Sequence, residues 1–229
     1  MTATAKILGL YTGKPEQRWD EKAPSAIRKS RVEGPLIITK TGFSGDQQAD
    51  LEVHGGPEKA LHHYPSEHYA SWAVTFGTDA FDYTLGTFGE NISSVGFAED
   101  DLCIGDVFAV GTARLQISQG RQPCWKLNLH TSNPAMAANF QKSAKTGWYY
   151  RVLETGKIEA GDSMTLDDRP CPSWNLRDVI LARFNPRLDP EIAKALSELA
   201  ELAEPWRAAF AKKASPDFNE DTSRRLQGG

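Results

Sequence analysis

Cys124 is the residue whose surroundings most clearly indicate chemistry in this chain of 229 residues. It directly follows Pro123 and lies between two cations, Arg121 and Lys126. Neighbouring positive charge favours the thiolate over the thiol, and the thiolate is the form that attacks electrophiles or binds soft metals. A lone cysteine more often serves as a small buried hydrophobe, but the flanking cations favour a functional thiolate here.

A second stretch, residues 45–64, combines paired glycines with charged residues. Gly55 and Gly56 let the backbone approach a ligand closely and present N–H groups to an anion. Lys59 follows closely and can supply charge, although a tight turn with a solvated lysine accounts for the same pattern. The stretch therefore predicts either an anion site or a simple turn.

Histidines are concentrated in the same part of the chain. Four of the five lie within fifteen residues: His54, His62, His63 and His68. Their spacing matches neither the H-E-x-x-H zinc motif nor a C2H2 finger. A metal bound directly by histidines is therefore not expected, and the last three are interpreted as structural or surface residues.

Composition narrows the class of protein. With 40% hydrophobic residues the chain can bury a full core. A net charge of −4 argues against the strongly basic surface of nucleic-acid-binding proteins. No run approaches 18 consecutive apolar residues, and the start lacks a signal-peptide core and cleavage site. We expect a cytoplasmic protein that contacts neither membrane nor nucleic acid.

The cysteine count and the missing fingerprints bear on cofactors. The three cysteines, Cys103, Cys124 and Cys171, contain no C-x-x-C pair, which argues against a zinc finger, a four-cysteine iron–sulfur cluster and a disulfide framework. Neither G-x-G-x-x-G nor a P-loop is present, so nothing indicates a built-in dinucleotide or NTPase site. Electrons for a redox reaction would have to come from outside.

Period-two alternation predicts the strands that position Cys124. The clearest element is a hairpin of 107–110 and 114–118 joined by Gly111-Thr112, which delivers Cys124 on the following loop. Further strands are expected at 6–11, 26–32, 36–39, 148–153 and 163–166. Many short strands with Gly-Asp turns indicate a mainly antiparallel sheet or barrel.

A change from period two to period 3.6 marks a boundary near residue 168. We therefore expect a β domain over 1–168, a three-helix domain over 169–214, and a flexible tail over 215–229 without a folded role. Asp189 is the expected N-cap of the second of these helices, with Pro190 at its first position, and Pro205 opens the third. One earlier helix is expected near Pro65.

Six motifs in order closely resemble the MOSC domain, and its YiiM-type branch in particular. They are Ser25–Lys29, Gly45–Asp50, Val53–Ala60, Phe88–Asn91, Gln119–Leu127 and Gly147–Leu153. The resemblance covers roughly residues 5–215 and implies a mainly β fold, a β-barrel-like domain with a small C-terminal three-helix appendage. It also implies binding of the molybdenum cofactor, whereas pyridoxal phosphate is not expected. The chain departs from the pattern at Gly120, where relatives often carry proline, which predicts a more flexible loop.

The resemblance assigns roles to single residues. Cys124 matches the thiolate that ligates the metal, a soft donor that suits molybdenum. The residues expected to bind the cofactor, through its phosphate or pterin, are Lys29, Gly55, Gly56, Lys59, Asn91, Arg121 and Lys126. His54 and Glu90 are the expected proton donors.

Two functions remain open at this point. Some MOSC proteins reduce N-hydroxylated small molecules, including base analogues such as 6-hydroxylaminopurine, which implies reduction of R–NHOH to R–NH2 and water. That reaction consumes two electrons, so an external flavoprotein or iron–sulfur electron donor is the expected partner. MOSC domains also occur at the end of cofactor sulfurases, so Cys124 could instead carry a persulfide in a sulfur-delivery or cofactor-handling protein. The sequence leaves the oligomeric state open.

Overall fold

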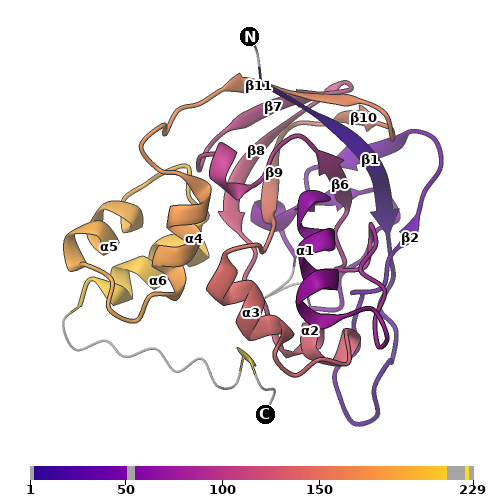
Figure 1. Cartoon of the computed structure of the whole chain (residues 1–229). Coiled ribbons are helices and arrows are strands. Elements are labelled where there is room, and N and C mark those ends of the chain that lie inside the picture. Colours follow the sequence, from indigo (N-terminus) through magenta and orange to yellow (C-terminus); the bar gives the residue numbers. More distant parts are fainter. Residues whose placement is uncertain (1–2, 51–54, 216–224, 227–229) are drawn as a thin grey trace.

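The computed structural model describes residues 3–50, 55–215 and 225–226 (Figure 1). Its central feature in these ranges is an eight-stranded sheet with the order β11-β7-β8-β9-β5-β6-β1-β2, in which β11 also pairs with β1. That extra pairing closes the sheet into a barrel, while β2 (Ser30–Arg31) stays outside the ring on β1. The strands of the ring are β1 (Thr4–Thr12), β5 (Leu61–Pro65), β6 (Ile92–Val95), β7 (Val107–Val110), β8 (Ala113–Gly120), β9 (Trp148–Glu154) and β11 (Ser163–Asp168). The prediction of a mainly β barrel is confirmed.

The hairpin that leads to Cys124 forms as the alternation predicts. In the antiparallel pair of β7 and β8, Val107 lies opposite Gln116 and Val110 opposite Ala113, which leaves Gly111 and Thr112 as the turn. Gly111 has a φ of +52°, and a Cβ there would lie 2.1 Å from the Lys157 carbonyl oxygen. Conformation and space therefore both require glycine at this turn.

The predicted strand over 26–32 is wrong for most of its length. Only Ser30–Arg31 pairs with β1, because the Ser25 hydroxyl accepts a hydrogen bond from the Ile27 amide at 3.2 Å and turns the backbone away from a ladder. The other expected strands are present, and β3 (Leu36–Thr39) joins β4 (Gly42–Phe43) and β10 (Gly156–Ile158) in a separate small sheet.

The helices lie outside the barrel in two groups (Figure 1). The first group is α1 (Glu67–Phe76), α2 (Trp125–His130) and α3 (Met136–Ser143). The second is the appendage of α4 (Leu176–Phe184), α5 (Pro190–Ser197) and α6 (Glu204–Lys213). Asp189 caps α5 as predicted, accepting from the Glu191 amide at 2.8 Å. In the ranges that the structure describes, no helix has both the length and the apolar character to cross a membrane.

Two buried clusters hold these layers together. The larger fills the barrel and continues without interruption into the appendage, so that Leu115 of β8 belongs to the same cluster as Ile180 and Trp206. The smaller is an aromatic cluster beneath α1, α2 and α3 that includes Tyr64 and Phe88. The division into domains at residue 168 stays a prediction, since the appendage shares the core of the barrel.

Gly120 is the point where the appendage meets the barrel. It ends β8, paired with Trp148, and does not form the looser loop expected from its departure from the motif. A Cβ at Gly120 would lie 2.3 Å from Ile180 Cγ1 and 3.0 Å from Trp206 Cη2. Glycine is therefore what lets α4 and α6 close onto the strand that leads to Arg121.

Candidate functional site

A cavity opens where β8 ends and α2 begins. It contains about 620 Å³ of space free of atoms, part of it open solvent. Six residues predicted from the sequence line it: Lys29, Lys59, Asn91, Arg121, Cys124 and Lys126. The lining residues range from Ser25 to Tyr149 in the sequence, so the barrel assembles the site from segments that are distant along the chain.

Arg121 and Cys124 are fixed by the backbone that follows β8. The Arg121 amide donates to the Gly147 carbonyl at 3.0 Å, and its Nη1 donates to the Phe88 carbonyl at 2.7 Å. Arg121 is only 9% exposed. Cys124 is the extended residue that precedes α2, and its carbonyl accepts from the Leu127 amide at 3.0 Å. The half-buried thiol of Cys124 is free and lies on the cavity wall.

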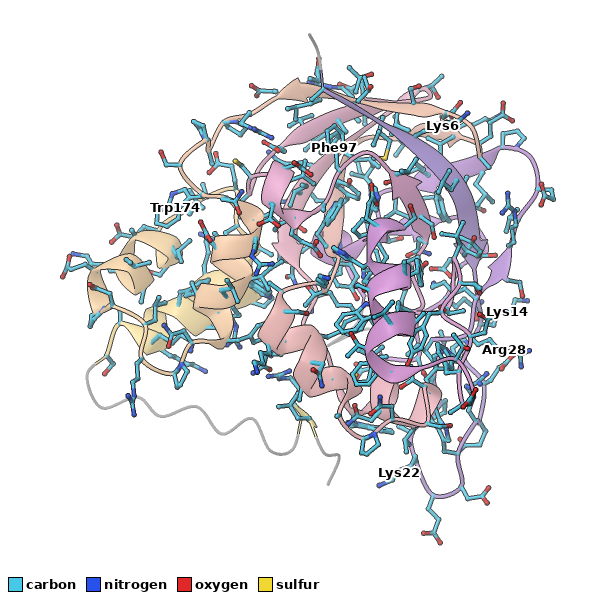
Figure 2. The ribbon with its side chains drawn as sticks, viewed as in Figure 1. Lys6, Lys14, Lys22, Arg28, Phe97 and Trp174 are labelled. Atoms are coloured by element: carbon cyan, nitrogen blue, oxygen red, sulfur yellow. The ribbon has the colours of Figure 1, made fainter. Side chains whose placement is uncertain are left out.

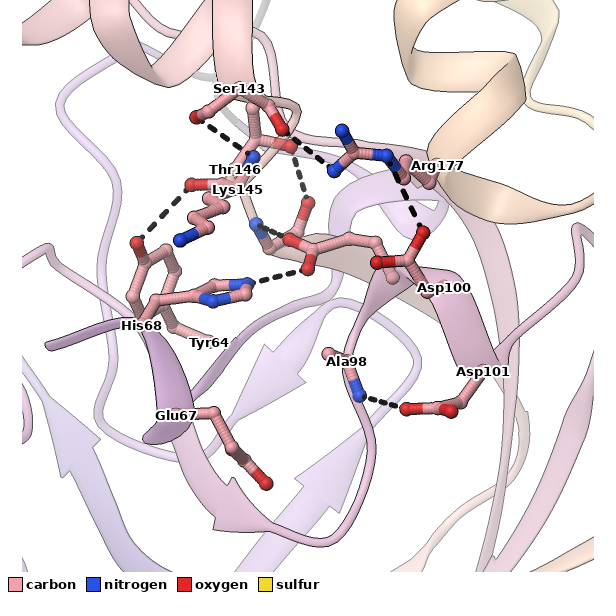
Figure 3. Close-up of polar contacts among 12 residues, drawn as sticks. Tyr64, Glu67, His68, Ala98, Asp100, Asp101, Ser143, Lys145, Thr146 and Arg177 are labelled. Carbon is pink, nitrogen blue, oxygen red and sulfur yellow. Dashed lines mark hydrogen bonds and ion pairs between the residues drawn. The ribbon is translucent and has the colours of Figure 1, made fainter. Parts of the chain in front are cut away.

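The backbone at Gly147, to which Arg121 is tied, is itself held by a buried pair of hydrogen-bonded side chains, one of which is His68 (Figure 3). Glu99 accepts from His68 Nε2 at 2.6 Å and from the Gly147 amide at 2.8 Å. Both side chains are almost fully buried. His68 therefore has a structural role, as the sequence predicts: through Glu99 it holds Gly147, whose carbonyl binds the Arg121 amide.

Lys29 enters the cavity but pairs with a buried carboxylate, Asp46, which belongs to a motif but was not predicted as its partner. Its Nζ lies 2.5 Å and 2.7 Å from the two carboxylate oxygens of Asp46, which also accepts from Asn91 Nδ2 at 2.8 Å. Burial lowers the pKa of Lys29, and the Asp46 charge opposes that lowering. The neighbouring Arg28, in contrast, is exposed at the edge of the molecule (Figure 2).

Asn91 acts as a connector in this network. Its Nδ2 also donates to the Tyr11 carbonyl at 3.2 Å, and its Oδ1 accepts from the His62 amide at 3.1 Å. With both ends of the amide in use, Asn91 joins β1, β5 and Asp46 at the floor of the cavity. Its expected contact with a pterin or phosphate stays a prediction.

His62 is a site residue that sequence reasoning missed. It lines the cavity, and its Nε2 is buried without a hydrogen-bond partner among the described residues. Burial, reinforced by the positive charge of Arg121, holds the pKa of His62 well below its usual value. The ring packs beside Tyr149, another lining residue, with centroids 5.0 Å apart. The ring is therefore a neutral imidazole in the wall of the cavity.

Glu90, one of the two expected proton donors, does not line the cavity. Its carboxylate is fully buried and accepts from the Tyr69 hydroxyl, from Ser93 Oγ at 2.8 Å, and from the amides of Gly86 at 2.6 Å and Phe88 at 3.1 Å. Four donors occupy the acceptor positions of an ionised carboxylate. This arrangement favours a structural role, in which Glu90 holds the loop whose Phe88 carbonyl binds Arg121.

The remaining predictions fall within residues 54–59 of the sequence. His54, the other expected proton donor, lies outside the described residues. Gly55 and Gly56 do not line the cavity; Gly56, with a φ of +93°, precedes the short helix η1 (Pro57–Lys59). Lys59, at the end of that helix, does line it, and burial lowers its pKa while the charge of Asp50 opposes the effect.

The lining residues suit a negatively charged ligand that contains a soft metal. Arg121 and three lysines supply positive charge, Cys124 supplies one soft sulfur donor, and His62 adds a neutral imidazole. Lys126 is the most peripheral of the lysines: its Nζ donates to the Pro24 carbonyl at 3.0 Å and lies 5.7 Å from the Trp125 ring centre. The residues present therefore fit the molybdenum cofactor, which combines a phosphate, a polar pterin and a metal that takes thiolate ligands.

Comparison with known proteins agrees with this architecture. Residues 50–165 match the family model described as MOSC domain. Protein YiiM of Escherichia coli (strain K12) is 40% identical over 219 residues, which cover 96% of this chain and 97% of that protein. A protein of Gibberella moniliformis (strain M3125 / FGSC 7600) that is named Reductase is 37% identical over 163 residues, 69% of this chain and 29% of that protein. The crystal structure of YiiM from Geobacillus stearothermophilus matches with a TM-score of 0.78 at 31% identity, covering 92% of this chain and 100% of that chain.

The closed barrel, the order of its motifs and these matches define one class, and the chain belongs to the MOSC domain family. Within that family it is similar to YiiM proteins over almost its whole length. The resemblance to the YiiM-type branch is therefore confirmed.

Proposed function

We propose that this protein is a molybdenum-cofactor-dependent reductase that converts N-hydroxylated compounds, R–NHOH, into amines, R–NH2. The observation that supports the proposal is that Cys124, Arg121 and the lysines line the same cavity. MOSC domains bind the molybdenum cofactor, and the similarity to a fungal protein named Reductase supports an oxidoreductase role. The reaction balances as R–NHOH plus two electrons and two protons giving R–NH2 and water.

The chain's residues divide the work of holding the cofactor. Cys124 would ligate the metal, while Arg121 and Lys59 would bind the phosphate, Arg121 through its planar fork and Lys59 as a point charge. Lys29 contributes less net charge because Asp46 pairs with it. When bound, the cofactor supplies the two-electron chemistry that cleaves the N–O bond.

Glu90 is not proposed as the proton donor, because its carboxylate is fully buried and does not line the cavity. Lys59, which would bind the phosphate, lines the cavity, and burial lowers its pKa. His62 stays neutral near pH 7 and can form a hydrogen bond with a bound molecule without adding charge. The substrate is then held in a site that is positive overall but contains one neutral, orientable ring.

The deciding experiment is metal analysis of protein made in a host with intact cofactor biosynthesis, combined with an assay of 6-hydroxylaminopurine reduction using a chemical reductant. We expect stoichiometric molybdenum and amine product in the wild type, and loss of both in Cys124→Ser with the fold retained. Full activity in Cys124→Ser would overturn the assignment of the metal ligand. Cyanide-labile sulfur on Cys124 in molybdenum-free protein would favour the persulfide carrier instead.

The cationic residues give a second, independent measurement. Arg121→Ala and Lys59→Ala should each retain less cofactor through gel filtration than Lys142→Ala, an exposed control on α3, because a charge-assisted hydrogen bond contributes about 1.5–3 kcal/mol. Arg121→Ala should have the larger effect, since it also breaks the bond to the Phe88 carbonyl. Equal cofactor content in the three variants would remove the phosphate-binding role.

A further inference from the structure

Arg225, near the C-terminus, contacts the loop that carries Cys124. Its Nη1 donates to the Pro123 carbonyl at 2.5 Å, and its Nη2 donates to Gln141 Oε1 at 2.7 Å. The centre of the guanidinium lies 5.3 Å from the centre of the Phe184 ring. One side chain therefore joins the loop before α2, helix α3 and helix α4, which differs from the expectation that the tail has no folded role.

Leu226 anchors the same segment on the other side of α2. Its side chain packs against the aromatic cluster beneath α1, α2 and α3. Its carbonyl accepts from Asn128 Nδ2 at 3.0 Å, and Asn128 Oδ1 accepts from the Ala137 amide at 2.8 Å. The contacts of Leu226 thus continue through α2 into α3, so that Arg225 is held in place from both sides.

The bond from Arg225 restricts the backbone of Cys124 itself. The Pro123 carbonyl and the Cys124 amide lie in one planar peptide group, and the proline ring fixes its own φ. Holding that carbonyl fixes the plane from which Cys124 starts, while the bond from the Leu127 amide holds the Cys124 carbonyl on the other side. With the peptide groups on both sides bonded, the direction of the Cys124 Cα–Cβ bond, which carries the thiol, is restricted.

We propose that Arg225 is a positioning residue that holds the Cys124 thiol toward the cavity, with Leu226 as its anchor. The inference rests on the proposed function only in its purpose, namely that the positioned thiol ligates a metal. The positioning itself is a property of the chain without cofactor, and it can be measured there.

The test uses the full chain purified from a host that lacks cofactor biosynthesis. Two quantities are measured: the rate at which iodoacetamide alkylates Cys124, followed on its peptide by mass spectrometry across pH, and hydrogen exchange of the α2 amides. The pH series separates the limiting rate, which reports motion of the loop, from the pKa of the thiol. In Arg225→Ala we expect both the limiting rate and the exchange rates in α2 to rise about tenfold, as follows from losing a charge-assisted hydrogen bond.

Two further variants sharpen the result. Arg187→Ala removes an exposed arginine beyond the end of α4 and should leave both measurements at the wild-type values. Arg225→Lys keeps the positive charge but lacks the planar fork that reaches Pro123 and Gln141 together, so its rates should be intermediate.

The outcomes are distinguishable. Wild-type alkylation and exchange in Arg225→Ala would overturn the proposal, and so would a rise in exchange spread evenly over the barrel, which would indicate a general brace. If Arg225→Ala fails to fold, Arg225→Lys decides: faster alkylation of Cys124 at an unchanged melting temperature supports positioning, and wild-type rates refute it. None of these readouts depends on molybdenum, so a failure of the reductase proposal would leave them unchanged.

Discussion

The three cysteines differ in what surrounds their sulfur atoms. Cys103 and Cys171 are buried, and burial raises the pKa of both thiols, that of Cys171 to about 12 with a further contribution from Glu201. The Cys103 thiol also lies 3.6 Å from the Pro172 carbonyl oxygen. Both remain protonated thiols near neutral pH, whereas Cys124 lies on an open cavity with cations around it.

A thiol reagent should therefore distinguish the three. We expect native protein without cofactor to react with one equivalent of Ellman's reagent at pH 7.5, and Cys124→Ser to react with none until denaturant is added. A count of free thiols under native and denaturing conditions measures this. Rapid reaction of two or three thiols in the native wild type would show that burial does not protect Cys103 and Cys171.

The buried imidazole of His63 gives the protein a defined pH response. Its Nδ1 lies 3.0 Å from the Tyr150 hydroxyl and its Nε2 lies 2.6 Å from Ser94 Oγ, and burial lowers its pKa to about 3. Between that value and the ordinary pKa of about 6.5, only the unfolded chain binds a proton, so the free energy of unfolding rises with pH. The contribution is complete above pH 6.5 and is lost as the pH falls toward 3.

In urea unfolding at pH 7, 6, 5 and 4, His63→Gln should show a pH slope shallower by up to about 1.4 kcal/mol per unit than the wild type. The relevant quantity is the difference in slope and not the lower stability of the variant. The lowered pKa of His130 also makes the free energy of unfolding fall as the pH falls, in wild type and variant alike. Parallel pH profiles for wild type and variant would show that His63 does not titrate on unfolding.

The parts of the site that could be predicted from sequence are those contained in one short segment. Arg121, Cys124 and Lys126 lie within six positions, so their mutual charge effect is visible in the sequence. His62 was missed as a cavity residue, and Asp46 was missed as the partner of two cavity residues, because it meets Lys29 across 17 residues and Asn91 across 45. Glu90 was predicted as a proton donor for a similar reason: its place in a motif is visible in the sequence, but the burial of its carboxylate in the core is not.

At the scale of elements, the contact between β8 and the appendage decides the shape of the cavity wall. Gly120 ends the strand directly under Ile180 and Trp206, and Arg121 follows at once. A helix that packs against the last residue of a strand restricts where the next residue can go. The appendage therefore contributes to the site without lining it.

Gly120→Ala should destabilise the protein by about 1–3 kcal/mol through overpacking against Ile180. The relevant test is a double-mutant cycle with Ile180→Ala, which removes the atom that the new methyl group would meet. In this cycle the losses of stability should be less than additive. Ile180→Ala leaves space beside residue 120, and the methyl group of Gly120→Ala fills part of that space. Additive losses in thermal unfolding would mean that the two residues do not share this contact.

Element predictions succeeded where the pattern is local and failed where a side chain redirected the backbone. The hairpin and the Asp189 cap depend on a few consecutive residues and were predicted correctly. The strand over 26–32 was not, because the bond between the Ser25 hydroxyl and the Ile27 amide competes with the ladder. Apolar alternation alone carries no information about such a bond.

At the scale of the whole molecule, we expect the proposed reaction to take its electrons from a second protein. Each turnover consumes two electrons, and the sequence contains neither a flavin nor a nicotinamide fingerprint. We expect no steady reduction of 6-hydroxylaminopurine by NAD(P)H with the pure holoprotein, and turnover once a flavoprotein reductase is added. Product analysis by liquid chromatography measures this. Sustained turnover by the isolated, flavin-free chain with NAD(P)H would contradict the expectation.

Closure of the barrel also places a demand on the timing of synthesis. Thr4 of β1 lies opposite Thr165 of β11, so about 160 residues, or roughly 8–30 s of translation at ordinary rates, separate the two partners. Once β6 has been made, it covers one edge of β1, and β2 pairs with the end of the other edge at Tyr11 and Thr12. The backbone groups that β11 will pair with, from Thr4 to Lys6, stay open to unintended strands until then. We therefore expect the start of the first strand to need shielding until β11 has left the ribosome.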